Sequence, residues 1–214
     1  MHTVRVFSRA VVFGFLLVFW LGVSFASSFV NVELPQNISF QMPRNWVVSS
    51  GTEMISLEAF FKSLMPQSTN DMSFQATLKN EKTQSIARLQ VHYWKSEKRQ
   101  MDIMGLLDFD LAAYNNSMRN QMTVQLHRVG SRMTSWWGTT KENINGLNVL
   151  ISEYSRTSQS IAGHFRVQVL RIYCGLNSFS LLVSYHEEAI LPLRPTVNKI
   201  ISTLESDSCK DESV

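Results

Sequence analysis

Residues 147–154 read LNVLISEY, residues 165–173 read FRVQVLRIY and residues 179–185 read FSLLVSY, and these three runs decide the fold. Each run is rich in apolar, β-branched and aromatic residues, which is typical of β-strands. Asn145–Gly146 forms a turn before the first run, and residues 174–177 form another before the last. Strand-like runs joined by short polar connections predict an antiparallel meander that the remainder of the chain must cover.

The chain before the meander alternates between strand-like and helical patterns. Strands are predicted at residues 29–34, 38–42, 45–48, 72–79 and 86–94. A long helix is predicted over residues 102–122, because apolar side chains recur there at helical spacing: Ile103, Leu107, Leu111, Tyr114, Met118 and Met122. Residues 124–129 and 133–141 lead into the meander.

After the meander, the sequence predicts a closing helix that starts near Pro195, a residue favoured in the first helical turn. Its buried face is expected to contain Val197, Ile200, Ile201 and Leu204. The polar tail from Glu205 to Val214 is expected to be frayed apart from Cys209. No repeat or linker divides the chain, so residues 27–214 are predicted to form a single domain.

The composition argues against binding to nucleic acid through bulk charge, and no nucleic acid is expected as a partner. Hydrophobic residues make up 44% and charged residues 17% of the chain, which is a globular balance. The formal net charge is +3, but Arg5 and Arg9 lie in the first segment, which leaves 18 Lys and Arg against 17 Asp and Glu. Binding to nucleic acid needs a clustered basic face, which this balance does not favour.

The first 26 residues have the layout of a secretory signal peptide. Arg5 and Arg9 precede the apolar run of residues 10–23, and Ser24-Phe25-Ala26 places small residues before a cleavage point between Ala26 and Ser27. The alternative is an uncleaved anchor, because the apolar stretch through residue 30 approaches the ~20 residues of a membrane span. Membrane contact is expected only through this segment, if it is uncleaved. Both interpretations place the body of the protein in the periplasm or outside the cell.

The chain has two cysteines, Cys174 and Cys209. In an oxidising compartment an even number of cysteines suggests a disulfide, which would tie the C-terminal tail to the end of the second meander strand. The alternative is a pair of free thiols, with Cys174 buried in the sheet. A catalytic cysteine is not favoured, because the sequence places no histidine beside either residue.

The segment Ile38-Ser39-Phe40-Gln41-Met42-Pro43-Arg44-Asn45-Trp46 resembles the opening motif of the PsbP-like and DcrB-like families. The order of elements, over about residues 36–204, is similar as well. This resemblance implies an α+β fold, with an α/β/α sandwich around a mostly antiparallel sheet. It also implies a largely non-enzymatic role, as a subunit of a membrane complex, a binding adaptor, a chaperone of secreted effectors or a periplasmic immunity protein.

The sequence signals no catalytic, metal or cofactor site. His92, His127, His164 and His186 are scattered without the spacing of metal ligands. His186 does precede two glutamates and could help to hold a cation, although a solvated corner is the simpler interpretation. No phosphate-binding, dinucleotide-binding or serine-hydrolase motif is present, so we expect a protein that is not an enzyme and takes no cofactor.

Tryptophans provide the candidate binding face. Trp94 follows Tyr93, and Trp136 is followed by Trp137. Because neighbours in a strand point to opposite sides of the sheet, one ring of each pair lies in the core and the other lies under a helix or at the surface. An exposed tryptophan would be a natural anchor for a partner, whereas a sandwich that covers both faces would bury both rings.

These observations lead to three functional hypotheses. The first is an exported non-catalytic module that binds an envelope or secreted protein. The second is an immunity protein that neutralises a toxin delivered to the periplasm. The third is a small hydrolase or ligand-binding enzyme with a dispersed site, which requires a polar pocket that joins His92, His127 or His186 to a carboxylate.

Overall fold

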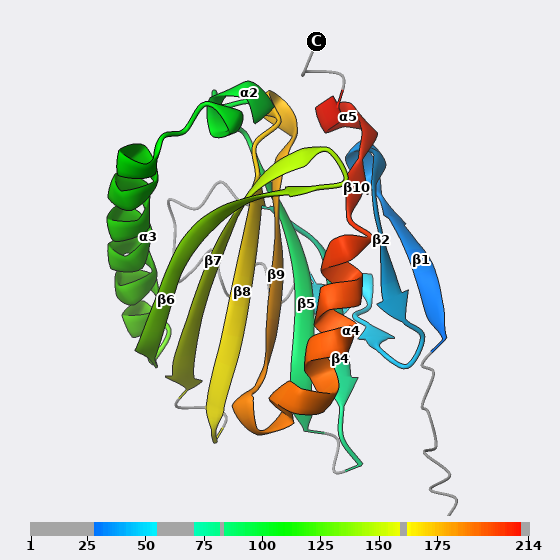
Figure 1. Ribbon diagram of the computed structural model, residues 1–214. Helices are drawn as coiled ribbons and strands as arrows, with labels where there is room; N and C mark the ends of the chain where they lie inside the picture. Colours follow the sequence, from blue (N-terminus) through cyan, green and yellow to red (C-terminus); the bar gives the residue numbers. More distant parts are fainter. Residues whose placement is uncertain (1–27, 55–70, 82–83, 159–161, 211–214) are drawn as a thin grey trace, which may run out of the picture.

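The computed structural model describes residues 28–54, 71–81, 84–158 and 162–210 (Figure 1). A seven-stranded sheet contains, in spatial order, β3 (Val47–Val48), β4 (Asp71–Lys79), β5 (Ser85–Trp94), β9 (Ser178–His186), β8 (His164–Ile172), β7 (Leu147–Ser158) and β6 (Ser131–Ile144). A three-stranded sheet contains β1 (Phe29–Leu34), β2 (Ile38–Pro43) and β10 (Glu205–Ser206). Helices and helical turns connect them: η1 (Pro35–Asn37), α2 (Gln100–Met104), α3 (Asp108–Arg128), η2 (Gly175–Asn177), η3 (Glu187–Ala189), α4 (Ile190–Ser202) and α5 (Asp207–Lys210).

The predicted meander is confirmed as β7, β8 and β9, which pair antiparallel in sequence order. The turn that leads into β7 has Asn145 at φ 50° and Gly146 at φ 86°. Positive φ at both central residues suits a tight hairpin turn, and Asn-Gly is the pair that adopts it most readily. The turn therefore sets the register in which Ile144 faces Leu147.

The main core lies between the seven-stranded sheet and a layer made of α4 and the small sheet. Alternate residues of β5 and β9 point into this core, among them Leu89 and Leu181, which are fully buried. The apolar face of α4 supplies Val197 and Ile200, also buried. Leu204 completes the buried face that the sequence predicts at this end of the chain.

The other side of the sheet is covered over β6, β7 and β8 by α3. Leu126 of α3 packs with Tyr154 and Val167, and a second cluster joins Ile103 of α2 to Leu150. Helices therefore lie on both sides of an antiparallel sheet. This arrangement confirms the α+β fold with an α/β/α sandwich that the sequence resemblance implies.

The single helix predicted over residues 102–122 is wrong, because the structure has two helices, α2 and α3, with a break between them. Asp102 caps α2 by accepting a hydrogen bond from the backbone N–H of Arg99 at 2.7 Å. Lys141 of β6 donates from Nζ to the carbonyl oxygens of Met104 and Leu106, at 3.1 and 2.8 Å. This lysine satisfies backbone groups that the break would leave without partners. Residues 124–128, expected to lead into the meander, instead end α3.

Two expectations for the C-terminal region are also corrected. The closing helix begins at Ile190, five residues before Pro195, which lies inside the helix. The apolar spacing from Leu193 to Val197 and Ile200 extends the buried face backwards and outweighs the starting preference of proline. The described part of the polar tail is ordered, because Glu205–Ser206 pairs with β2 as β10.

Cys174 and Cys209 form a disulfide, with their Cα atoms 5.1 Å apart. Both residues are fully buried at the end of the main core. Cys174 lies directly before η2, and its backbone N–H donates to Ser178 Oγ at 3.0 Å. The bond fastens α5 and β10 to the sheet and so ties the tail to the core.

No helix in the described ranges is long and apolar enough to cross a membrane. The predicted signal segment, with its cleavage point between Ala26 and Ser27, lies outside the described residues. The helical spacing of Met54, Leu57, Phe60, Phe61 and Leu64 also predicts a short helix that opens at Thr52, and most of this segment lies outside the described residues too.

Alkaline pH is expected to destabilise the fold through its buried tyrosines. Burial raises the pKa of Tyr154 and of Tyr173 above the ordinary value, and the neighbouring Tyr114 raises the pKa of Tyr173 further. Because the unfolded chain releases these protons near pH ~10 while the folded chain retains them, their stabilising contribution is complete below that pH. It is lost as the pH rises further, by up to ~1.4 kcal/mol per pH unit for each tyrosine.

Urea unfolding at a series of pH values measures this effect. Above pH ~10, we expect the free energy of unfolding of Tyr154→Phe to fall less steeply with pH than that of the unmodified protein. The same pH dependence of the free energy of unfolding in both proteins would contradict its assignment to Tyr154.

Candidate functional site

A β-bulge in β6 sets the directions of two adjacent tryptophans. The pairing of β6 with β7 shifts register between Trp136 and Gly138, so Trp137 is the extra residue of the bulge. Gly138 has φ +114°, a conformation that side chains other than hydrogen rarely tolerate. Bulges of this kind redirect a side chain without ending the strand.

Trp136 points to the α3 side of the sheet. Its indole Nε1 donates to Asn115 Oδ1 of α3 at 3.0 Å, and its ring stacks on Tyr154 with centroids 6.1 Å apart. The buried polar atom of the indole thus has a partner, as packed tryptophans usually do. Trp136 therefore serves to join α3 to the sheet.

Trp137 points to the opposite side and is 49% exposed. The guanidinium carbon of Arg166, on β8, lies 3.9 Å from the centroid of the Trp137 ring. Arg166 Nε also donates to Glu153 Oε1 of β7 at 2.6 Å. Three strands thus contribute one side chain each to a row across the sheet, which we call the Trp137 face: Trp137, Glu153 and Arg166.

Hydrogen bonds and charges hold the Trp137 face in place. Gln168 Nε2 donates to Glu153 Oε1 at 3.2 Å, so this carboxylate oxygen accepts from two donors. The hydrogen bond with Glu153 raises the pKa of Arg166, which stays protonated at every physiological pH. The ion pair is partly exposed and contributes at most ~1 kcal/mol to stability, but it fixes the plane on which Trp137 rests.

The Trp137 face is not covered by α4. In Figure 1, α4 lies in front of β5 and leaves the front of β6, β7 and β8 open. Glu187 of η3 accepts a hydrogen bond from Ser155 of β7. The Trp137 face is therefore a part of the sheet beside α4 where one large aromatic ring is exposed next to charged and polar side chains.

The three tryptophans predicted as a binding face do not share one face. Trp94 lies on the α3 side of the sheet, where its ring meets Tyr173 edge to face with centroids 5.7 Å apart. Trp136 lies on that same side, and Trp137 alone of the three points the other way. Sequence reasoning missed Arg166 and Glu153, because pairing them with Trp137 requires the register of three strands.

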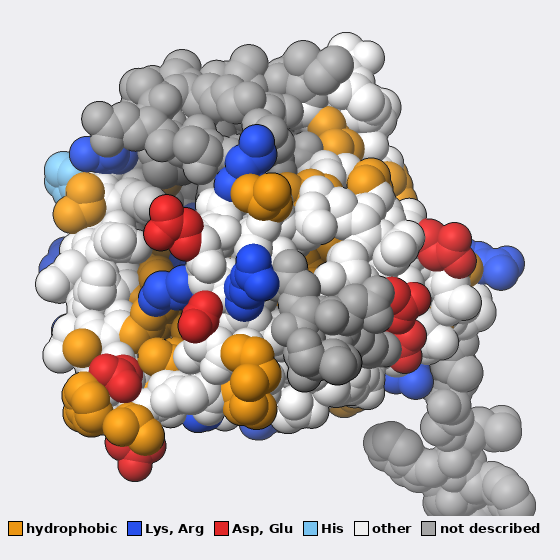
Figure 2. Space-filling view, turned by 90° about the horizontal axis from the view of Figure 1, so that it is seen from above, with side chains coloured by type: hydrophobic (Ala, Val, Ile, Leu, Met, Phe, Trp, Pro, Cys, Tyr) orange, Lys and Arg blue, Asp and Glu red, His pale blue; other side chains and the backbone are white. Residues whose placement is uncertain are grey.

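A second exposed apolar area surrounds α2 and the start of α3, but it lacks comparable organisation. Met101, Met104 and Phe109 are each more than half exposed there. In Figure 2, which views this end of the molecule, hydrophobic side chains occur in several groups separated by charged ones. Scattered apolar side chains of this kind are normal on protein surfaces. The Trp137 face is therefore the better candidate for an interface.

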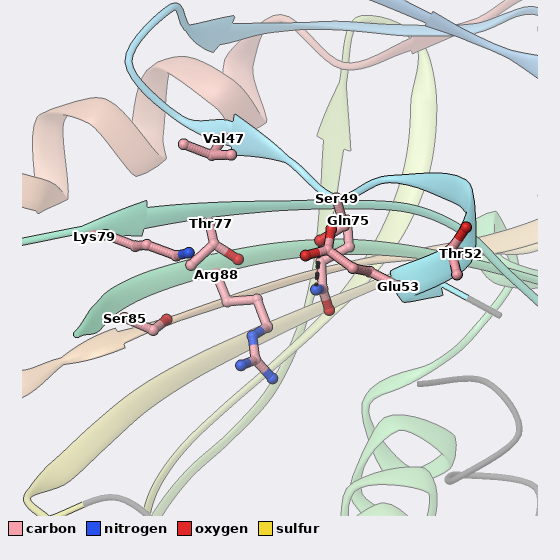
Figure 3. A pocket seen from close by; sticks show the side chains of 9 residues that line it. All are labelled: Val47, Ser49, Thr52, Glu53, Gln75, Thr77, Lys79, Ser85 and Arg88. Atoms are coloured by element: carbon pink, nitrogen blue, oxygen red, sulfur yellow. Dashed lines mark hydrogen bonds between the residues drawn. The ribbon is translucent and has the colours of Figure 1, made fainter. Parts of the chain in front are cut away.

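A pocket of about 420 Å³ is lined by residues of β3, β4 and β5 and by the helical turn at residues 51–54, which follows β3 (Figure 3). Most of the residues that line it are polar by type, and three of them are charged: Glu53, Lys79 and Arg88. It contains no histidine, so it does not form the arrangement that the hydrolase hypothesis requires.

The predicted corner at His186 and Glu187 does not form a metal cluster. His186 packs on the ring of Phe165 with centroids 4.2 Å apart, and Glu187 is engaged with Ser155. Within the described residues, no group of three or more His, Cys, Asp or Glu side chains is placed to hold a metal ion.

No protein-family model and no curated protein sequence matches the chain. Among solved structures, cyanobacterial PsbP from Synechocystis sp. PCC 6803 is similar, with a TM-score of 0.51, 10% identity and coverage of 86% of this chain and 96% of that one. The Ran-binding protein Mog1p of Saccharomyces cerevisiae has a TM-score of 0.44, 7% identity and coverage of 85% and 96%. LpqN of Mycobacterium tuberculosis, described as involved in cell envelope biogenesis, has a TM-score of 0.43, 10% identity and coverage of 83% and 89%.

At identities of 10% or less, a structural similarity shows a shared fold and says nothing about a shared activity. The first of the three, a PsbP, covers nearly the whole of both chains, in agreement with the resemblance that the sequence indicates. The chain therefore has the PsbP-like fold.

Proposed function

We propose that this chain is an exported, non-catalytic accessory module of the cell envelope that binds another protein through the Trp137 face. The observation that carries the proposal is the exposed Trp137 ring, fixed on the guanidinium of Arg166. The signal-like first segment supports an extracytoplasmic location. A PsbP-like fold is compatible with an accessory role, and the partner is a protein of the envelope or of the extracellular space.

Tryptophan and arginine are the residues that most often dominate the energy of protein interfaces. Burying the exposed half of the Trp137 ring would contribute up to ~3 kcal/mol to binding. Because Arg166 and Glu153 already hold the ring in one orientation, little side-chain freedom would be lost on association. The Trp137 face thus combines an apolar anchor with a preorganised polar surround, as efficient interfaces do.

Crosslinking in intact cells, followed by purification of this chain, tests the proposal. We expect Trp137→Ala to reduce the yield of a specific crosslinked partner at least ~10-fold, as expected for the loss of a central anchor. Val48→Ala is the matched control, because Val48 is also 49% exposed but lies on β3, at the opposite edge of the sheet. The control is expected to retain the partner.

Equal recovery of the same partner with both variants would exclude the Trp137 face as the interface. Recovery of a toxin encoded beside this chain would narrow the role to that of an immunity protein. Toxicity upon deletion of this chain alone would then be expected.

A further inference from the structure

The pocket between β3, β4 and β5 lies on the side of the sheet opposite to the Trp137 face. In β5, Ala87 and Leu89 point into the core beneath α4, so Arg88 between them points the other way. Thr77 is the partner of Arg88 across the pairing with β4 and lines the same pocket. A volume of about 420 Å³ is within the range of small-molecule sites.

Two residues that line the pocket, Ser49 and Gln75, belong to a polar network that continues to Gln90 in β5. Gln90 Nε2 donates to Gln75 Oε1 at 2.8 Å, and Gln75 Nε2 donates to Ser49 Oγ at 2.9 Å. Gln75 and Gln90 are almost fully buried. Buried side chains that are hydrogen-bonded to one another cannot rotate freely, so Gln75 and Ser49 present their polar atoms to the pocket in one arrangement.

Arg88 brings a positive charge to this pocket, and the described part of the chain supplies it with no counterion. Among the residues that the structure describes, it has neither a hydrogen-bond nor an ion-pair partner. Burial lowers the pKa of Arg88, and the positive charge of Arg156 lowers it further. In Figure 3 the guanidinium projects away from Lys79 and Thr77. A partly buried cation is costly unless an anion accompanies it, so an anionic ligand at Arg88 would be favoured.

We propose that this pocket binds a small organic anion through a single carboxylate group held by Arg88. The planar guanidinium can donate two parallel hydrogen bonds to a carboxylate, and Lys79 adds a second positive charge to the pocket lining. Hydroxyl groups of Thr77 and Ser85 line other parts of the pocket.

Glu53 sets an upper limit on the charge of the ligand. Its Oε2 accepts a hydrogen bond from the backbone N–H of Ser50 at 2.8 Å, and this bond lowers the pKa of the carboxyl group. Glu53 is therefore ionised at neutral pH, and its negative charge opposes a second negative charge on the ligand. A monocarboxylate is thus favoured over phosphate or a polycarboxylate. The inference is independent of the Trp137 face.

Calorimetric titration with lactate, acetate and inorganic phosphate tests this site at constant ionic strength. We expect saturable binding of at least one monocarboxylate, and Arg88→Gln is expected to weaken it ~10-fold or more. Arg132→Gln is the matched control, because Arg132 is an exposed arginine on β6, and it is expected to bind as the unmodified protein does. Lys79→Gln provides a second variant in the pocket lining, expected to weaken binding several-fold whether or not Arg88→Gln folds.

Three results would overturn the proposal. The first is a titration in which neither lactate nor acetate gives a saturable binding signal up to ~10 mM, because a dissociation constant above that concentration would be too weak for specific recognition. The second is saturable binding of phosphate alone, because it would show a different ligand class. The third is binding that neither Arg88→Gln nor Lys79→Gln weakens.

Discussion

Replacing Cys174 and Cys209 together by alanine is expected to lower the free energy of unfolding by about 4 kcal/mol. The two residues are 35 positions apart, and a crosslink that closes a loop of this length removes about that much conformational entropy from the unfolded chain. Both sulfur atoms are also buried in the main core, so the substitution removes packing as well as the crosslink. Local loosening is expected at α5 and β10, which the bond fastens to the sheet.

Urea unfolding with and without a reductant measures this effect. The unmodified protein should become less stable when reduced, whereas the double alanine variant should not respond to the reductant. A loss of less than ~1 kcal/mol on reduction would show that the tail is held without the disulfide, for example by the hydrogen bond from Ser208 Oγ to the Gln36 carbonyl.

Replacing each of the two neighbouring tryptophans of β6 by alanine is expected to change the free energy of unfolding by very different amounts. Trp136→Ala should lower the free energy of unfolding by about 3 kcal/mol, because it removes the stacking on Tyr154 and the hydrogen bond to Asn115. Trp137→Ala should change it by less than ~1 kcal/mol, because half of this ring faces solvent.

Thermal and urea unfolding of the two single variants provides the comparison, and each is the control for the other. Equal losses of stability would mean that Trp137 is also a structural residue and would weaken its assignment to an interface. A small loss for Trp136→Ala would contradict the role of this residue in joining α3 to the sheet.

Much of the sheet can be predicted from the sequence, because its strands have local signals. Alternation and β-branched content mark β5, β7, β8 and β9, and Asn145–Gly146 marks the hairpin between β6 and β7. The break between α2 and α3 could not be predicted in this way, because Lys141 stabilises it from a strand that comes later in the chain. The pairing of β10 with β2 also joins distant segments, and a two-residue strand has no local signal.

The candidate site could be predicted only in part. The sequence indicates that one ring of each adjacent aromatic pair could be exposed, but the bulge at Gly138 decides that Trp137 faces Arg166. For the pocket, alternation already separates Arg88 from the core positions of β5. Its lack of a counterion among the described residues depends on three-dimensional neighbours, which one sequence does not reveal.

The central claim, that the Trp137 face binds a protein, is tested most directly by a photoreactive amino acid placed at position 137 in cells. We expect irradiation to attach one discrete partner at this position and none at position 48, which is equally exposed on the opposite edge of the sheet. The same partner should be lost when Arg166→Ala is added, because the plane that supports the side chain at position 137 is then removed. Discrete crosslinks at position 48 with none at position 137 would contradict the claim and place the interface elsewhere on the molecule.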